Sequence, residues 1–136
     1  ALHVNTSLKS IDLSWNQLGK DGAIELAKAL HVNASITNLN HERNDIEKDG
    51  AVALAKALNV NASMNKLNVL ANSIGEEGYE MLTKMAEEKS MLTLCGFNDG
   101  QTEADLSRNH LGPIDAKLIA RELTTGFVSS SLNTLK

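Results

Sequence analysis

The sequence repeats itself at a spacing of 28 residues, and this repeat constrains the fold more than any other feature of the chain. Apolar residues recur at the same places in three segments, which start at Leu8, Ile36 and Met64. An asparagine lies eight residues after each of these starting points. One such segment cannot bury its apolar face alone, so its copies must stack on one another to form a core. The spacing therefore predicts a solenoid of stacked units.

Two kinds of periodicity follow one another within each unit. Ile11 and Leu13 alternate with polar residues, which is typical of a short strand with one buried face. From Gly22 to Leu30 the apolar residues are three and four positions apart, which is typical of an amphipathic helix. The copies of this pattern predict parallel strands near 10–14, 38–42 and 66–70, and helices near 21–31, 49–59 and 77–88. We therefore expect an α/β fold, with a curved parallel sheet inside and helices outside.

The spacing of Leu8, Ile11, Leu13, Asn16 and Leu18 resembles the leucine-rich repeat, written L-x-x-L-x-L-x-x-N-x-L. The 28-residue length and the helical second half resemble its ribonuclease-inhibitor-like class, and the resemblance extends over essentially the whole chain. It implies a leucine-rich-repeat solenoid. It also implies that the repeated asparagines are structural, because their amides bond the loop backbone of adjacent coils. The asparagine ladder expected in this chain consists of Asn16, Asn44, Asn72 and Asn109.

The repeat divides the chain into units of one solenoid segment, 1–136. These units are approximately 7–34, 35–62 and 63–90, an irregular fourth at 91–130, and the start of the next at 131–136. Residues 1–5 match the helix ends at 29–33 and 57–61, and neither end of the chain resembles a polar capping repeat. We therefore expect this chain to be a piece of a longer array.

The fourth unit departs from the period. Residues 92–97 keep the apolar spacing of a strand, but Asn109 comes 37 residues after Asn72 instead of 28. The segment 92–97 and the strand that leads to Asn109 are separated by only about five residues. They cannot lie side by side as parallel strands, because a parallel crossover needs about a dozen residues or more. Either residues 98–100 (Asn-Asp-Gly) turn an antiparallel hairpin, for which Asp-Gly is favoured, or residues 92–97 form an extended lead-in that fills the core.

Composition argues against several functional classes. The net charge is −4, and only four residues are Phe, Trp or Tyr, so we expect no nucleic-acid-binding surface. No apolar run approaches the roughly 20 residues that a membrane span needs. The single Cys95 cannot form an internal disulfide, and we expect an intracellular protein, located in the cytoplasm or within an organelle.

The sequence contains no pattern that predicts catalysis or cofactor binding. Its four histidines do not have metal-ligand spacing, and no nucleophile–base pair or phosphate loop is present, so we expect no enzyme, no cofactor and no metal site. His41 occupies a core position, as either a hydrogen-bonded core histidine or a sign of a distorted strand. Cys95 takes the core position of Leu67 and is expected to be a buried apolar residue. Asn-x-Ser triplets at Asn5, Asn33 and Asn61 resemble glycosylation sites, but their recurrence indicates polar turn residues.

The inner, concave face of the sheet is the predicted binding surface, because solenoids usually bind ligands there. Strand alternation places polar side chains in columns across this face, with Trp15 and Arg43 at its rim. Tryptophan and arginine are enriched at interface hot spots. The predicted protein-binding face consists of Asp12, Ser14, Trp15, Asn40, Glu42, Arg43, Asn68, Leu70, Asp105 and Arg108.

These observations predict a non-enzymatic scaffold for protein–protein interaction, as a subunit or segment of a larger assembly. The resemblance offers two alternatives. One is a regulator of a small GTPase that resembles the Ran GTPase-activating protein, although the acidic tail typical of that family is absent from this sequence. The other is the sensor arm of a protein that resembles an immune receptor.

Overall fold

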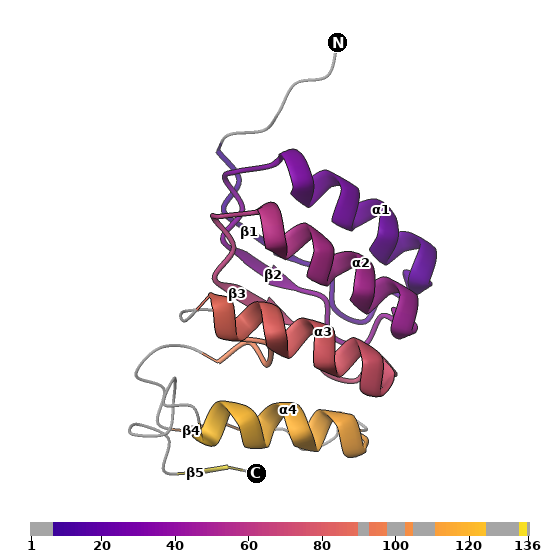
Figure 1. The fold of residues 1–136 in the computed structure, drawn as a ribbon, viewed down its shortest axis with the longest axis vertical. Helices are drawn as coiled ribbons and strands as arrows, with labels where there is room; N and C mark the ends of the chain where they lie inside the picture. The colour runs from indigo at the N-terminus through magenta and orange to yellow at the C-terminus, as the bar shows by residue number, and fades with distance from the viewer. Residues whose placement is uncertain (1–6, 90–92, 98–102, 105–110, 125–133, 136) are drawn as a thin grey trace.

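The first three units each contribute one strand to a parallel sheet (Figure 1). The computed structural model describes residues 7–89, 93–97, 103–104, 111–124 and 134–135. Strands β1 (Ser10–Asp12), β2 (Asn38–Asn40) and β3 (Lys66–Asn68) lie in that order, and each residue pairs with the one 28 positions further along. The prediction of three parallel strands is therefore confirmed, although each strand ends two residues earlier than expected.

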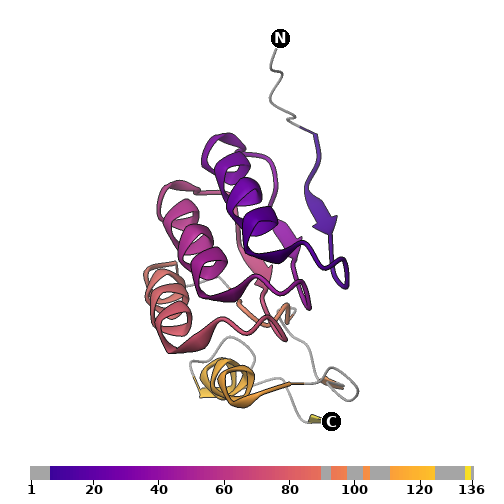
Figure 2. The same cartoon turned by 90° about the vertical axis from the view of Figure 1, so that its right-hand side faces the viewer.

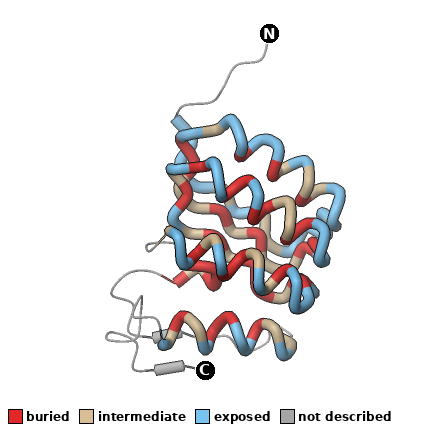
Figure 3. The backbone as a smooth tube through the Cα atoms, in the orientation of Figure 1, coloured by how far each residue is buried: buried red, intermediate tan, exposed pale blue. Residues whose placement is uncertain are grey.

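Helices α1 (Gly19–Val32), α2 (Glu47–Val60) and α3 (Gly75–Glu88) pack side by side on one face of this sheet (Figures 1 and 2). Each begins two residues before its predicted start. The core between sheet and helices contains Leu39 and Leu67 from the strands, which are almost fully buried. Burial is concentrated on the inner sides of the helices and strands (Figure 3).

Small residues bring the helices close together. A Cβ atom added to Gly50 of α2 would lie 2.9 Å from the Cβ of Ala23 in α1. A Cβ added to Gly78 of α3 would lie 2.9 Å from the Cβ of Ala51 in α2. Such contacts are too short for any side chain, so glycine at this position allows each helix to lie directly against the alanine of its neighbour.

The turn from strand to helix has an unusual backbone in all three units. Three alternate residues in each turn have positive φ, namely Trp15, Gln17 and Gly19, then Arg43, Asp45 and Glu47, then Ala71, Ser73 and Gly75. Only the third of these positions carries glycine, and only in the first and third units. A non-glycine residue in the left-handed region costs about 1–2 kcal/mol, so the second unit carries strain that its neighbours avoid.

Replacing Glu47 with glycine is therefore expected to raise the free energy of unfolding by about 1 kcal/mol. The φ of Glu47 is 58°, close to the 70° and 71° of Gly19 and Gly75. The matched control is Gly19→Ala, which should lower stability by a similar amount, because its added Cβ would meet nothing within 4 Å and only the backbone is strained. Chemical denaturation of the three proteins measures both changes. A Glu47→Gly protein less stable than the parent would contradict the assignment of strain.

The fourth unit continues the sheet with a shifted register. Leu67 N donates a hydrogen bond to Thr93 O at 2.9 Å, and Val69 N donates to Leu94 O at 3.0 Å. Thr93 forms an isolated parallel bridge with Lys66, so the displacement there is 27 residues instead of 28, whereas the bridge between Cys95 and Asn68 is antiparallel. The prediction that Cys95 takes the position of Leu67 is wrong by one residue, because Cys95 bridges to Asn68, and the preceding Leu94 is fully buried. Cys95 is nevertheless buried, as expected.

Residues 93–97 lie against β3 and fill the core, as the extended lead-in predicts, while the hairpin alternative is not tested. Leu94, Cys95 and Phe97 are all buried beside β3. Strand β4 (Glu103–Ala104) pairs in parallel with β5 (Thr134–Leu135), in a second sheet, and no described pairing joins it to residues 93–97. The proposed hairpin turn at residues 98–100 lies outside the described residues.

Helix α4 (Pro113–Thr124) continues the outer layer beside α3 (Figure 1). It begins with Pro113, whose fixed φ suits the first turn of a helix. None of the helices in the described part of the chain is long and apolar enough to span a membrane.

Candidate protein-binding face

The central column of the predicted binding face lies on the three strands in register. Asp12 pairs with Asn40, and Asn40 with Asn68. Each side chain also turns the chain at the end of its strand, because Oδ1 accepts a hydrogen bond from the backbone N–H two residues later, at 3.0–3.1 Å. These are Asx turns, and they explain why every strand stops at this position. Hydrogen bonds from the side chain and backbone of Ser14 lower the pKa of the Asp12 carboxyl.

The next predicted column, which follows the ends of the strands, lies only partly on the face. Ser14 and Glu42 are partly exposed, but Leu70 is buried, so its assignment to the binding face is wrong. The alternation used to place Leu70 holds only within a strand, and β3 ends at Asn68. Asp105 and Arg108 lie outside the described residues, and their predicted positions are not tested.

Glu42 combines partial burial with an incomplete set of hydrogen bonds. Asn68 Nδ2 donates to its Oε2 at 3.2 Å, whereas its Oε1 is buried and accepts no hydrogen bond within the described structure. Burial raises the pKa of the Glu42 carboxyl, and the negative charges of Asp12 and Asp115 raise it further. The strand face is therefore acidic around Asp12 and Glu42.

Trp15 and Arg43 meet at the rim of the face, as the sequence predicted. The Arg43 Cζ lies 3.9 Å from the centroid of the Trp15 ring, which is within the range of a cation–π contact. Trp15 is nevertheless 56% exposed. Both residues have positive φ, so the strand-to-helix turns direct them to the same side. A hollow of about 340 Å³ is lined by Trp15, Gln17, Arg43, Asn44, Asp45 and Ala71.

A second hollow follows the strands themselves. Its volume is about 370 Å³, and its lining is polar and apolar in about equal parts. The lining residues are Ser10, Ile11, Asp12, Asn38, Leu39, Asn40, Lys66, Asn68 and Gly96. The strand face and its rim therefore offer two hollows, and the exposed ring of Trp15 lines one of them.

The predicted asparagine ladder is present in the described units. Asn44 Oδ1 accepts hydrogen bonds from Asn16 N at 3.1 Å and Leu18 N at 3.2 Å. Asn44 Nδ2 donates to Leu13 O at 2.7 Å, in the preceding unit. Asn72 repeats the arrangement one unit later, with Asn44 N donating to its Oδ1 at 2.7 Å. Asn109 lies outside the described residues.

A second ladder at the other end of each unit was not predicted. Asn61 Nδ2 donates to Leu30 O and Asn33 O, both at 2.9 Å. Lys89 occupies the corresponding place in the third unit, and its Nζ donates to Asn61 O at 2.6 Å. The 28-residue recurrence of Asn33 and Asn61 is the sequence signal for this ladder, although polar turns alone also account for it. The amide of Asn61 is engaged in the fold, which argues against glycosylation there.

His41 is fully buried, as its core position predicted, but it is not a hydrogen-bonded histidine. Neither Nδ1 nor Nε2 has a hydrogen-bond partner within the described structure. The strand is not distorted either, because His41 N donates to Asn68 O at 2.9 Å in the regular pattern. Burial lowers the pKa of the imidazole to about 4, so it is neutral at pH 7.

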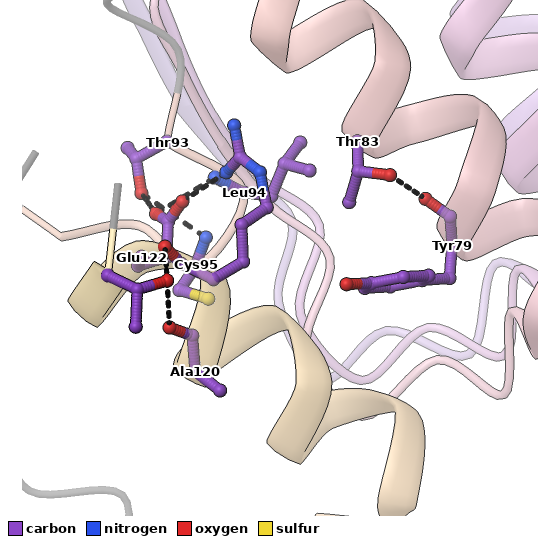
Figure 4. A network of polar contacts seen from close by, with 9 residues as sticks. Tyr79, Thr83, Thr93, Leu94, Cys95, Ala120 and Glu122 are labelled. Carbon is purple, nitrogen blue, oxygen red and sulfur yellow. Dashed lines mark hydrogen bonds and ion pairs between the residues drawn. The ribbon is translucent and has the colours of Figure 1, made fainter. Parts of the chain in front are cut away.

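A buried carboxylate holds the shifted strand of the fourth unit (Figure 4). Glu122 of α4 is fully buried, and it accepts hydrogen bonds from Thr93 Oγ1 and, at 3.2 Å, from Leu94 N. It also pairs with Arg121 at 2.5 Å. Burial raises the pKa of Glu122, and burial raises the pKa of the nearby Cys95 thiol well above its usual value. Cys95 is therefore not suited to thiolate chemistry.

Metal ligands do not gather in the described structure. No group of three or more histidine, cysteine, aspartate or glutamate residues there could hold a metal ion.

Comparison with known proteins agrees at the level of the fold. A leucine-rich-repeat family model matches residues 4–27. The solved structure named Leiomodin-1 Actin-Binding Site 2 (ABS2) is similar to this chain with a TM-score of 0.59 and 21% sequence identity. The similarity covers 88% of this chain and 66% of that chain, so this chain spans slightly less than two thirds of that structure. No curated protein matches the sequence. The family-model match and the structural similarity together support a leucine-rich repeat protein.

Proposed function

We propose that this protein is a non-enzymatic scaffold that binds another protein through the strand face and its Trp15–Arg43 rim. The exposed Trp15 ring with the Arg43 guanidinium 3.9 Å from its centroid is the observation that carries this proposal. Tryptophan and arginine are both enriched at interface hot spots, and here they lie against each other. The hollow that Trp15 and Arg43 line supplies a recess in which a partner can contact this pair.

The proposal includes the finer class and context expected from the sequence. The 28-residue displacement between strands supports a ribonuclease-inhibitor-like solenoid. The same units support a role as a segment of a larger assembly, since one unit buries only part of its surface. An intracellular location also belongs to the proposal, supported by the single buried thiol of Cys95.

Actin is the first partner to test, because the leiomodin-1 structure carries the name of an actin-binding site. Similarity at 21% identity indicates the fold alone, so actin is one candidate among protein partners. The two alternatives, a regulator of a small GTPase and an immune-sensor arm, receive no specific support from the residues that the structure describes.

Truncation of the rim pair is expected to weaken partner binding strongly. Trp15→Ala and Arg43→Ala should each raise Kd about 30-fold, which corresponds to the roughly 2 kcal/mol typical of a hot spot. The measurement is an affinity series by titration calorimetry, first against monomeric actin and then, if actin does not bind, against a purified protein that the chain captures.

The matched controls lie on the opposite side of the molecule. Lys28 and Lys56 are exposed on α1 and α2, and their alanine variants should change Kd by less than about twofold. If the lysine variants weaken binding and Trp15→Ala does not, the helices form the contact surface and the proposed face is wrong.

A further inference from the structure

The guanidinium of Arg43 has no acceptor for its hydrogen bonds. Within the described residues it forms neither a hydrogen bond nor an ion pair, and its contact is with the Trp15 ring, whose centroid lies 3.9 Å from Cζ. Arg121, the other arginine that the structure describes, is by contrast paired with Glu122. A guanidinium presents its N–H donors in its own plane, so contact between its face and an aromatic ring leaves those donors available.

The row of side chains along the rim leaves space beside this guanidinium. Trp15, Arg43 and Ala71 hold the same place in successive units, have φ values of 64°, 56° and 58°, and line the same hollow of about 340 Å³. The strand order places Trp15 on one side of Arg43 and Ala71 on the other, where the side chain is only a methyl group. A group from a partner can therefore enter this rim hollow and reach Arg43 without displacing a large side chain.

The other polar groups near the rim hollow favour a ligand with one negative charge. The amide of Asn44 is already committed, because its Oδ1 and Nδ2 each make two hydrogen bonds within the ladder. Asp45 lines the hollow and Glu42 precedes Arg43 in the chain, so two acidic side chains lie near one guanidinium. They would repel a phosphate group, whose charge is about −2 at pH 7. A carboxylate carries half that charge and matches the planar donors of a guanidinium.

We propose that the rim hollow binds one aspartate or glutamate side chain of the partner protein, and that Arg43 donates two parallel hydrogen bonds to its carboxylate. This inference rests on the proposed function, because it names the group that the partner presents to the Trp15–Arg43 rim. The carboxylate belongs to a side chain and not to a chain end, because the partner continues past the rim over the strand face.

A small carboxylate tests the rim hollow without the partner. The probe is N-acetylglutamate α-amide, whose only charge is a side-chain carboxylate, and it is titrated into the full chain by NMR. Trp15 is the only tryptophan in the sequence, so its indole N–H signal reports on the site directly. We expect this signal and the Arg43 Nε–H signal to shift together and to saturate with a Kd of about 1–10 mM. N-acetylglutamine α-amide, the uncharged analogue, should produce no saturable shift.

Two variants of Arg43 separate geometry from charge. Arg43→Lys keeps the positive charge but loses the planar pair of donors, so its Kd for the probe should rise about tenfold or more. Arg43→Ala should not bind the probe, and its backbone accommodates alanine, because Ala71 has nearly the same φ at the same place in the repeat. Lys28→Ala, on the helical side, should bind the probe as the parent does. Circular dichroism checks the folding of each variant, and Arg43→Lys carries the comparison if Arg43→Ala does not fold.

Three results would overturn this inference alone. They are no saturable shift in the parent, equal affinity of Arg43→Lys and the parent for the probe, and tighter binding of inorganic phosphate or of N-acetylalanine, whose carboxylate is a chain end. The proposed function survives each of them if Trp15→Ala still weakens partner binding. If the parent binds the probe but Arg43→Ala and Trp15→Ala leave the partner's Kd unchanged, the partner does not use the rim, and both proposals are wrong.

Discussion

Replacing Asn72 with alanine is expected to lower the free energy of unfolding by about 3 kcal/mol. The Asn72 side chain is almost fully buried and makes five hydrogen bonds to backbone groups. Its Oδ1 accepts from Asn44 N and Ile46 N, while its Nδ2 donates to three carbonyl oxygens of the strand ends. Alanine leaves these buried groups without partners, and water cannot reach them. Chemical denaturation measures the loss.

Asn16→Ala is the matched control, because Asn16 holds the same place in the first unit but is exposed. Its Nδ2 donates to Leu13 O and Ser14 O, which water can also satisfy. We expect this variant to lose less than about 1 kcal/mol. Equal denaturation midpoints for Asn72→Ala and Asn16→Ala would show that the buried ladder does not stabilise the fold.

Acidification is expected to destabilise the protein by about 3 kcal/mol through His41 alone. Its pKa falls from 6.5 to about 4 in the folded protein, and each unit of pKa difference corresponds to about 1.4 kcal/mol. The unfolded chain therefore binds a proton before the folded chain does. The full stability is present above pH 6.5 and is lost progressively as the pH falls to about 4.

His41→Leu isolates this contribution. The variant should be more stable than the parent at pH 7 by about 1–2 kcal/mol, because two buried nitrogen atoms without partners are removed. The difference in free energy of unfolding between the variant and the parent should increase toward pH 4. Glu42 and Glu122, whose pKa values are raised, act with the opposite sign in both proteins and cancel in the difference. A gap that stays constant between pH 7 and pH 4 would contradict the buried neutral histidine.

The sequence predicted the features that recur in more than one repeat unit. The parallel pairing of Ser10 with Asn38 and the ladder at Asn44 follow from spacing alone, because a position repeated every 28 residues must meet its own copy. The Trp15–Arg43 contact was also predictable, since both residues hold one position in neighbouring units.

Features that depend on backbone geometry or on a single copy could not be predicted in this way. The burial of Leu70 depends on where β3 ends, and the Asx turn that ends it involves the same asparagine that we placed only on the face. The contact of Glu122 with Thr93 occurs once, in the unit where the period fails, so no second copy indicated it. Lys89 replaces an asparagine with a chemically different donor, which hides the repeat.

The change of displacement from 28 to 27 residues at Thr93 has a consequence for how such a chain can vary in length. Within the first three strands, gaining or losing one whole unit leaves every remaining side chain on its original face, whereas a one-residue change within a strand moves its buried side chains to the opposite face. The fourth unit has such a one-residue difference at Thr93, and Glu122 holds it by accepting hydrogen bonds from Thr93 and Leu94. One-residue insertions and deletions within a strand should therefore be tolerated best where a neighbouring helix supplies a comparable anchor.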